Sequence, residues 1–162
     1  MAFTCTHCGQ QHDQLPDIGF VMPHHAFILA EEERLARVKL TADTCVIDNE
    51  DFFIRGVLQI PILDNGECLG YGVWVSQSEE NFYSYAEAPD TADIGPTFGW
   101  FCSNIGEFAP TLNLKSRAHF QGGGLRPFIE LEPTDHPLAL AQQQGITLAR
   151  AWELVHQCLP LT

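Results

Sequence analysis

Basic residues are scarce in this sequence. It has 8 Lys and Arg against 21 Asp and Glu over 162 residues, which gives a formal net charge of −13 with histidine neutral. A field of this sign repels phosphate backbones and anionic headgroups, so nucleic acids and membrane surfaces are poor partners. Opposite charge speeds protein association. The composition therefore favours a basic protein as the partner, and it leaves the oligomeric state open.

Long hydrophobic runs are missing as well. No stretch approaches the roughly 20 apolar residues that a membrane helix needs, and the first residues lack the basic and apolar segments of an export signal. A cytoplasmic location is therefore expected. In a reducing compartment the six cysteines are interpreted as thiols or metal ligands rather than as disulfides.

Familiar catalytic motifs are also absent from the sequence. There is no Gly-x-Ser-x-Gly, no His-Glu-x-x-His and no calcium-loop pattern. Gly122-Gly123-Gly124 is followed by neither Lys-Ser/Thr nor a helix, which excludes a phosphate-binding loop. No reaction is therefore assigned by a motif.

What the sequence does contain is enough apolar mass for one core, with 45% hydrophobic residues including 11 Phe and 3 Trp. No repeat or linker divides residues 1–162. We therefore predict a single domain, in which a knuckle and loop over residues 1–23 precede an α+β body over residues 24–162.

The body shows no regular strand–helix alternation of the kind that a parallel sheet requires. Strands are expected at 44–47, 52–60, 69–76, 98–102, 112–120 and 128–132. Asp64-Asn65-Gly66 is typical of a tight hairpin turn. The prediction is an α+β fold with an antiparallel sheet of about five or six strands, short helices packed on it and an N-terminal CxxC knuckle.

The short helices have recognisable start signals. The run from residue 30 to 40 places acids first and bases last, which suits the helix dipole, and it puts Leu35 on an apolar side. We expect Ser78, Asp135 and Thr147 to cap three further helices.

Cys5-x-x-Cys8-Gly9 is the sharpest local motif, because two thiolates at this spacing can bind one metal ion. A structural zinc needs four ligands, so we predict a site formed by Cys5, Cys8, His12 and Cys45. His7, His24 and His25 are possible substitutes. Two alternatives stay open: a redox-active thiol pair and two ordinary reduced thiols. Three further cysteines lie beside apolar patterns and are expected in the core: Cys68, Cys102 and Cys158.

Arg55 lies between apolar neighbours on a predicted strand, where its charge must be paired if it is buried. Glu130 and Glu132 share one face of a later strand and are its possible partners. His136 follows Asp135 at a helix start, where it could serve in acid–base chemistry or simply lie at a helix cap. Arg55, Glu130, Glu132 and His136 are thus weak candidates for a catalytic group, and no residue is assigned to an organic cofactor.

Longer motifs extend over nearly the whole chain. They are Cys5-x-x-Cys8-Gly9-x-x-His12, Asp43-x-Cys45-Val46-Ile47, Phe53-Ile54-Arg55-Gly56-Val57-Leu58, Gly72-Val73-Trp74-Val75-Ser76, Phe98-Gly99-Trp100, Thr111-Leu112-x-Leu114-Lys115 and Arg126-Pro127-x-Ile129-Glu130-Leu131-Glu132-Pro133-x-Asp135-His136-Pro137-Leu138. In these motifs the chain resembles an uncharacterised bacterial domain-of-unknown-function family. The resemblance implies a bacterial single-domain protein with a cysteine at the position of Cys45, and it implies no activity.

Two functions from different classes follow. The first is a non-enzymatic protein-binding or regulatory module, such as an immunity protein, with a structural zinc site. The second is an enzyme that acts on a small anion with Arg55, Glu130, Glu132 and His136, or a thiol redox protein. The enzyme requires its four side chains to converge in one cleft. Since no nucleophile with an adjacent base is evident, the sequence favours the binding module.

Overall fold

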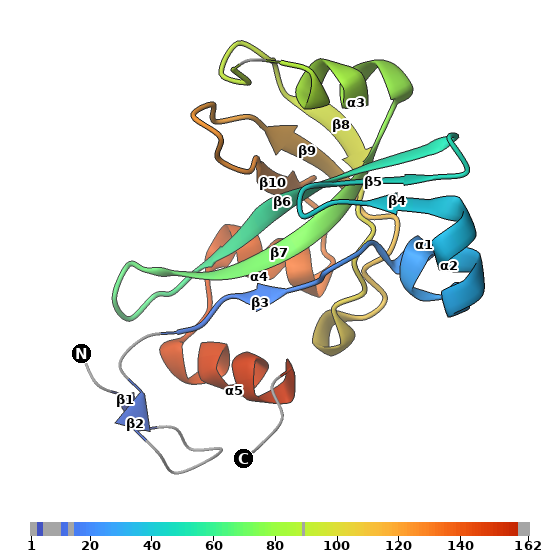
Figure 1. Ribbon diagram of the computed structural model, residues 1–162. Coiled ribbons are helices and arrows are strands. Elements are labelled where there is room, and N and C mark those ends of the chain that lie inside the picture. The colour runs from blue at the N-terminus through green and yellow to red at the C-terminus, as the bar shows by residue number, and fades with distance from the viewer. Residues whose placement is uncertain (1–2, 5–10, 13–14, 89, 159–162) are drawn as a thin grey trace.

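The computed structural model describes residues 3–4, 11–12, 15–88 and 90–158 (Figure 1). The strands are β1 (Phe3–Thr4), β2 (Gln11–His12), β3 (Ile18–Gly19), β4 (Val38–Leu40), β5 (Thr44–Ile47), β6 (Asp51–Pro61), β7 (Cys68–Gln77), β8 (Thr97–Trp100), β9 (Lys115–His119) and β10 (Phe128–Leu131). The helices are α1 (His24–Phe27), α2 (Glu31–Arg37), α3 (Glu79–Ala86), α4 (Pro137–Gln144) and α5 (Leu148–Cys158), with a 3-10 turn, η1, at Gly106–Phe108.

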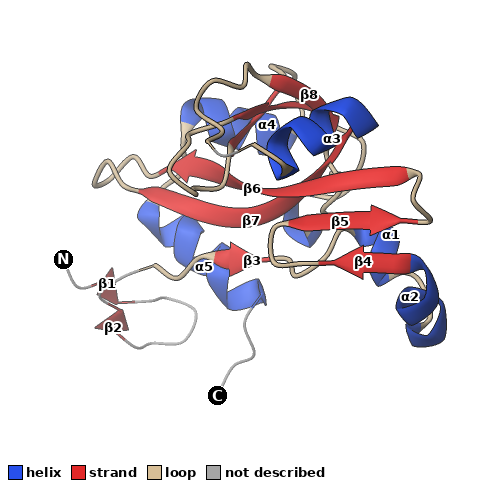
Figure 2. Cartoon of the chain, turned by 45° about the horizontal axis from the view of Figure 1, so that its top comes forward, coloured by secondary structure: helices blue, strands red, loops and turns tan. Residues whose placement is uncertain are grey.

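The long hairpin of β6 and β7 is the centre of the molecule (Figure 2). Its antiparallel register runs from Phe52 opposite Gln77 to Pro61 opposite Cys68. In the turn, the Asn65 side chain accepts a hydrogen bond from the Glu67 N–H at 2.9 Å, and Gly66 has φ +72°. That conformation favours glycine, so the predicted hairpin turn is confirmed.

The sheet is mixed, which corrects the prediction of an antiparallel sheet of five or six strands. Among the described residues, eight strands take part, in the order β3-β7-β6-β10-β9-β8, with β5 paired to β6 and β4 to β5. β10 runs parallel to β6, and β3 runs parallel to β7. Neither pair of strands is joined by a short turn, so the local sequence gives no signal of the parallel pairing. β3 and β4 are only two and three residues long, which explains why the sequence patterns missed them.

One edge of β6 is shared by two strands. β5 pairs with it from Asp51 to Ile54, and β10 pairs with it at Val57. Between these two pairings, the Arg55 N–H donates to the Asp43 carbonyl at 2.9 Å. We call this place the β5–β10 junction.

The two faces of the β6–β7 hairpin are covered differently. The main core lies on the face of Ile54, Leu58 and Val73, where residues of α3, α4 and α5 pack. The opposite face carries a smaller cluster: Ala26, Cys45, Ile47, Phe53, Trp74 and Cys102. Because α1 covers only the Phe53–Trp74 end of that face, Arg55 and the residues after it are left partly open to solvent.

The helix predictions are confirmed in part. The Ser78 and Thr147 hydroxyls accept hydrogen bonds from the N–H groups of Asn81 and Arg150, as expected of caps. The helix expected from 30 to 40 ends at Arg37 and continues as β4, and Leu35 is 81% exposed rather than packed. No helix in the described ranges has the length and apolar content that crossing a membrane requires. The predicted knuckle around Cys5 and Cys8 lies outside the described residues.

Candidate functional site

The four predicted catalytic residues are distributed over different places. Glu130 lines a cavity of about 470 Å³, where its carboxylate contacts His119 Nε2 at 3.1 Å. Glu132 lines another cavity of about 280 Å³ beside Lys115. Neither cavity is lined by Arg55 or His136. The geometry therefore does not assemble these side chains in one cleft.

The His136 ring serves as the N-cap of α4. Its Nδ1 accepts a hydrogen bond from the Leu138 N–H at 3.1 Å, and Nε2 lies 2.7 Å from the Pro110 carbonyl. Since Nδ1 accepts, Nε2 carries the proton and donates to Pro110. Both ring nitrogens are thus engaged by backbone groups. The cap predicted at Asp135 is wrong, because the side chain that accepts the helix N–H belongs to the next residue.

Arg55 has other neighbours than the sequence suggested. Its Nη1 lies 3.5 Å from the Ala42 carbonyl, and Arg126 Nη2 lies at the same distance from that oxygen. Arg126 Nε donates to the Asp43 carboxylate at 2.7 Å. Burial lowers the pKa of Arg55, the Arg126 charge lowers it further, and Asp43 opposes both. The partner of Arg55 is therefore the Ala42–Asp43 turn.

The described part of the chain holds no group of three His, Cys, Asp or Glu side chains that could bind a metal ion. Cys5 and Cys8 lie outside the described residues, and His12 is described only as part of β2. Cys45 is 0% exposed in the smaller apolar cluster, and burial raises the pKa of its thiol to about 12. The zinc site stays a prediction.

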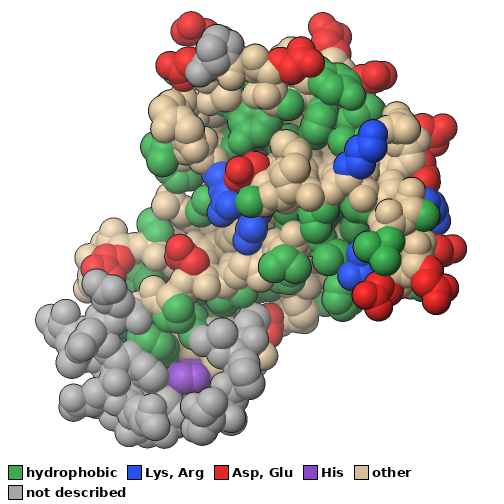
Figure 3. Space-filling model, viewed as in Figure 1, with side chains coloured by type: hydrophobic (Ala, Val, Ile, Leu, Met, Phe, Trp, Pro, Cys, Tyr) green, Lys and Arg blue, Asp and Glu red, His purple; other side chains and the backbone are tan. Residues whose placement is uncertain are grey.

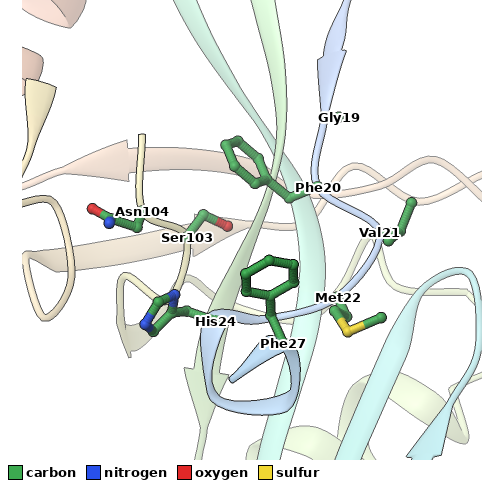
Figure 4. A pocket seen from close by; sticks show the side chains of 8 residues that line it. All are labelled: Gly19, Phe20, Val21, Met22, His24, Phe27, Ser103 and Asn104. Carbon is green, nitrogen blue, oxygen red and sulfur yellow. The ribbon is translucent and has the colours of Figure 1, made fainter. Parts of the chain in front are cut away.

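An exposed apolar surface at α1 was not foreseen from the sequence. Val21, Phe27 and Ile28 are 68%, 66% and 65% exposed. Val21 and Phe27 line a cavity of about 420 Å³, and Ile28 follows Phe27 in the chain. The cavity is lined by Gly19, Phe20, Val21, Met22, His24, Phe27, Ser103 and Asn104. Figure 4 shows the Phe20 and Phe27 rings near its middle, with Ser103 and Asn104 on one side and Val21 on the other. We call these three exposed residues and the cavity the α1 surface.

The α1 surface is rigidly attached to the sheet. The His24 N–H donates to the Cys102 carbonyl at 2.8 Å, and Trp74 Nε1 donates to the Phe20 carbonyl at 2.7 Å. Ala26 is 0% exposed and packs in the smaller cluster. Because Ala26 occupies the inward side of a four-residue helix, Phe27 is turned outward. The sequence signal was the adjacent pair Phe27-Ile28 shortly before the acidic run that begins at Glu31.

Acidic side chains border the α1 surface. Glu31, Glu32 and Glu33 form the first turn of α2, begin three residues after Ile28 and are exposed. Figure 3 shows acidic, basic and hydrophobic side chains together at the edge of the molecule where Figure 1 places α1 and α2. The apolar surface is therefore flanked by negative charge.

These features define a single-chain α+β protein with a mixed sheet, an exposed apolar surface and no assembled catalytic group among the candidates considered. The chain belongs to the family of uncharacterized proteins conserved in bacteria, DUF2199, whose model matches residues 4–146. The resemblance inferred from the motifs is thus confirmed. Comparisons with curated proteins and with solved structures found no match. The matched residues include the α1 surface, Arg55 and Arg126, whereas α5 lies beyond them.

Proposed function

We propose that this protein is a non-enzymatic binding module that docks a basic partner protein through the α1 surface. The observation that carries the proposal is the exposure of Val21, Phe27 and Ile28 beside a cavity, next to the acidic start of α2. A regulatory or immunity-type role, in which docking neutralises a basic protein, agrees with this combination.

Apolar burial would supply the affinity of such a complex. Removing apolar surface from water is worth about 25 cal/mol per Å², and exposed apolar patches rimmed by polar residues are typical of interaction sites. Aromatic anchors that fill pockets often dominate binding energy. Phe27 is the exposed aromatic side chain of the α1 surface, so it is the expected anchor.

Electrostatic attraction would favour a basic partner over an acidic one and increase its association rate. The net charge of −13 steers a basic protein toward this chain and repels an acidic one. Glu31, Glu32 and Glu33 place part of that charge directly beside the apolar residues. A partner with basic side chains around an apolar protrusion would match both properties.

The non-enzymatic part of the proposal is supported by the separation of the four candidate residues. Glu130 and Glu132 line different cavities, and both nitrogens of His136 contact backbone groups. The proposal also includes a structural zinc ion that would join the N-terminal residues to the body of the protein. The Cys5-x-x-Cys8 spacing supports this ion.

The test is partner capture from a bacterial lysate by the immobilised full chain, compared with Phe27→Ser. Leu125→Ser is the matched control, because Leu125 is 59% exposed but belongs to a different loop. We expect a basic protein to be retained by the wild type and by Leu125→Ser and to be lost with Phe27→Ser. Its association rate should fall steeply between about 0.05 and 0.5 M salt, because the Debye length shortens from more than 10 Å to less than 5 Å.

Retention that is equal for Phe27→Ser and Leu125→Ser would contradict the proposal, and so would association rates that do not depend on salt. Sedimentation analysis tests whether a second copy of this chain occupies the α1 surface instead of a basic partner. A wild-type dimer that Phe27→Ser converts to a monomer would identify a second copy of this chain as the partner and overturn the proposal of a basic one.

A further inference from the structure

The β5–β10 junction brings two guanidinium groups together on the open face of the sheet. Arg55 projects from β6, and Arg126 lies two residues before β10. Both reach toward the Ala42 carbonyl, each with one nitrogen at 3.5 Å. β5 stops pairing with β6 just before β10 starts to pair with it, and the gap between the two strands leaves space for both guanidinium groups. They come from positions 71 residues apart in the sequence.

Only one of these two cations has a carboxylate partner in the described part of the chain. Arg126 holds Asp43 in a 2.7 Å ion pair. Arg55 has no ion pair among the described residues, and its Nε is buried without a hydrogen-bond partner. Its contact with Ala42 lies at the limit of hydrogen-bond distance. A buried donor without a partner destabilises the fold, so Arg55 is held in an incompletely satisfied state.

Two glycines without Cβ atoms leave space for the Arg55 guanidinium. A Cβ atom on Gly19 would lie 3.0 Å from Arg55 Nη2, and one on Gly72 would lie 3.2 Å from it. These glycines are paired across β3 and β7. The Arg55 Cζ also lies 6.0 Å from the centre of the Trp74 ring. A Cβ atom at either glycine would make the guanidinium shift by a few tenths of an ångström, so the two glycines leave room for it over the sheet.

The local charge contrasts with that of the whole chain. The junction carries two arginines against Asp43, whereas the protein has a net charge of −13. Figure 3 shows basic side chains gathered near the middle of this face, beside an acidic one. Two like charges at close range are most stable with more than one counter-charge. The missing counter-charge would come from a ligand.

We propose that Arg55 and Arg126 form a binding site for a small oxyanion, a carboxylate or a phosphate group, at the β5–β10 junction. The planar guanidinium fork presents parallel N–H donors that match the oxygens of either group. The terminal Nη groups of Arg55 would bind the ligand directly, because its Nε is buried. Arg126 would add its charge while it keeps Asp43. This site lies on β6 and just before β10. It adjoins the α1 surface at Gly19, which lines the α1 cavity, but it does not depend on the proposed partner.

The experiment follows the Nε–H resonances of Arg55 and Arg126 by NMR while inorganic phosphate or acetate is added to the full chain. Sodium chloride keeps the ionic strength constant, so that screening does not change. We expect saturable shifts of both resonances, with a dissociation constant on the order of 1 mM because a simple anion makes few contacts. Saturation by phosphate alone would identify a phosphate ligand, and saturation by acetate would identify a carboxylate.

Three variants separate the site from general charge effects. Arg55→Gln should weaken binding at least tenfold, as monitored at Arg126. Arg150→Gln is the matched control, because Arg150 is also partly exposed and paired, with Glu153 at 3.1 Å. Gly72→Ala changes no charge but shifts the Arg55 guanidinium by a few tenths of an ångström, so it should weaken binding less than Arg55→Gln does.

The proposal is overturned if neither anion gives saturable shifts. It is also overturned if Arg150→Gln weakens binding as much as Arg55→Gln does. Amide spectra of each variant, compared with the wild type, verify that the fold is retained.

Discussion

Arg55 illustrates how a charged residue can occupy a strand without a buried ion pair. Its guanidinium rests over Gly72 and beside the Trp74 ring, and it is half-buried. The carboxylate whose charge acts on it, Asp43, is already paired with Arg126. Substitution of Arg55 therefore leaves no unpaired carboxylate buried in the core.

We predict that Arg55→Ala lowers the free energy of unfolding by about 1 kcal/mol, the typical cost of losing partly buried packing. Breaking a buried ion pair costs about 3–5 kcal/mol instead. Urea denaturation of the variant and the wild type distinguishes the two values. A loss of 3 kcal/mol or more would show that Arg55 neutralises a buried charge.

The cysteines differ in reactivity for a reason that their sequence context does not reveal. Cys45 and Cys102 are buried, whereas Cys68 is exposed at the start of β7, contrary to the core position expected for it. Burial raises the thiol pKa of both Cys45 and Cys102 to about 12. The thiolate is the reactive form.

At pH 8, which lies far below these raised pKa values, Cys45 and Cys102 should therefore remain unmodified by iodoacetamide while Cys68 is alkylated. Peptide mapping by mass spectrometry reports each site separately. Denaturant should make all three react. Rapid alkylation of Cys45 in the folded protein would contradict the burial described for it.

At the scale of elements, the start of α4 shows how closely spaced cap candidates compete. Asp135 and His136 are adjacent, and either side chain could accept a helix N–H. The structure selects His136, because its ring also reaches the Pro110 carbonyl. A second contact with a distant loop thus decides which residue forms the cap.

The adjacent residues Asp135 and His136 offer a matched test of the cap assignment. His136→Ala should cost about 1 kcal/mol of unfolding free energy, since it removes the cap. Asp135→Ala should change stability by less than about 0.5 kcal/mol, as surface substitutions usually do. Both values come from urea denaturation. A larger cost for Asp135→Ala than for His136→Ala would reverse the assignment of the cap.

At the scale of the whole molecule, the predicted zinc ion would join the N-terminal residues to the body. Metal binding contributes folding energy directly when its ligands come from separate segments. Elemental analysis by mass spectrometry should find about one zinc per chain. The double variant Cys5→Ser/Cys8→Ser should lose this metal and melt at a lower temperature, because Cys5 and Cys8 supply two of the four predicted ligands.

Cys68→Ser serves as the control, since Cys68 is exposed and was not predicted as a ligand. It should keep its zinc. A wild-type protein without metal, or a double variant with unchanged zinc content, would eliminate the predicted site.

Features that depend on neighbouring residues were determined by the sequence itself. The hairpin turn at Asp64-Asn65-Gly66 and the caps at Ser78 and Thr147 require only short-range geometry, and each is present as expected. The family membership, carried by motifs along the chain, was likewise evident. The net charge of −13 needs no structure at all.

Only the tertiary structure decided the relations between distant segments. The parallel pairings of β3 with β7 and of β10 with β6 depend on contacts that no local pattern encodes. The same holds for the meeting of Arg55 and Arg126, and for the outward turn of Phe27 once Ala26 packs inward. Both proposed sites arise this way, because a binding surface is formed by side chains that the folded backbone brings together, and their spacing in the chain does not record that proximity.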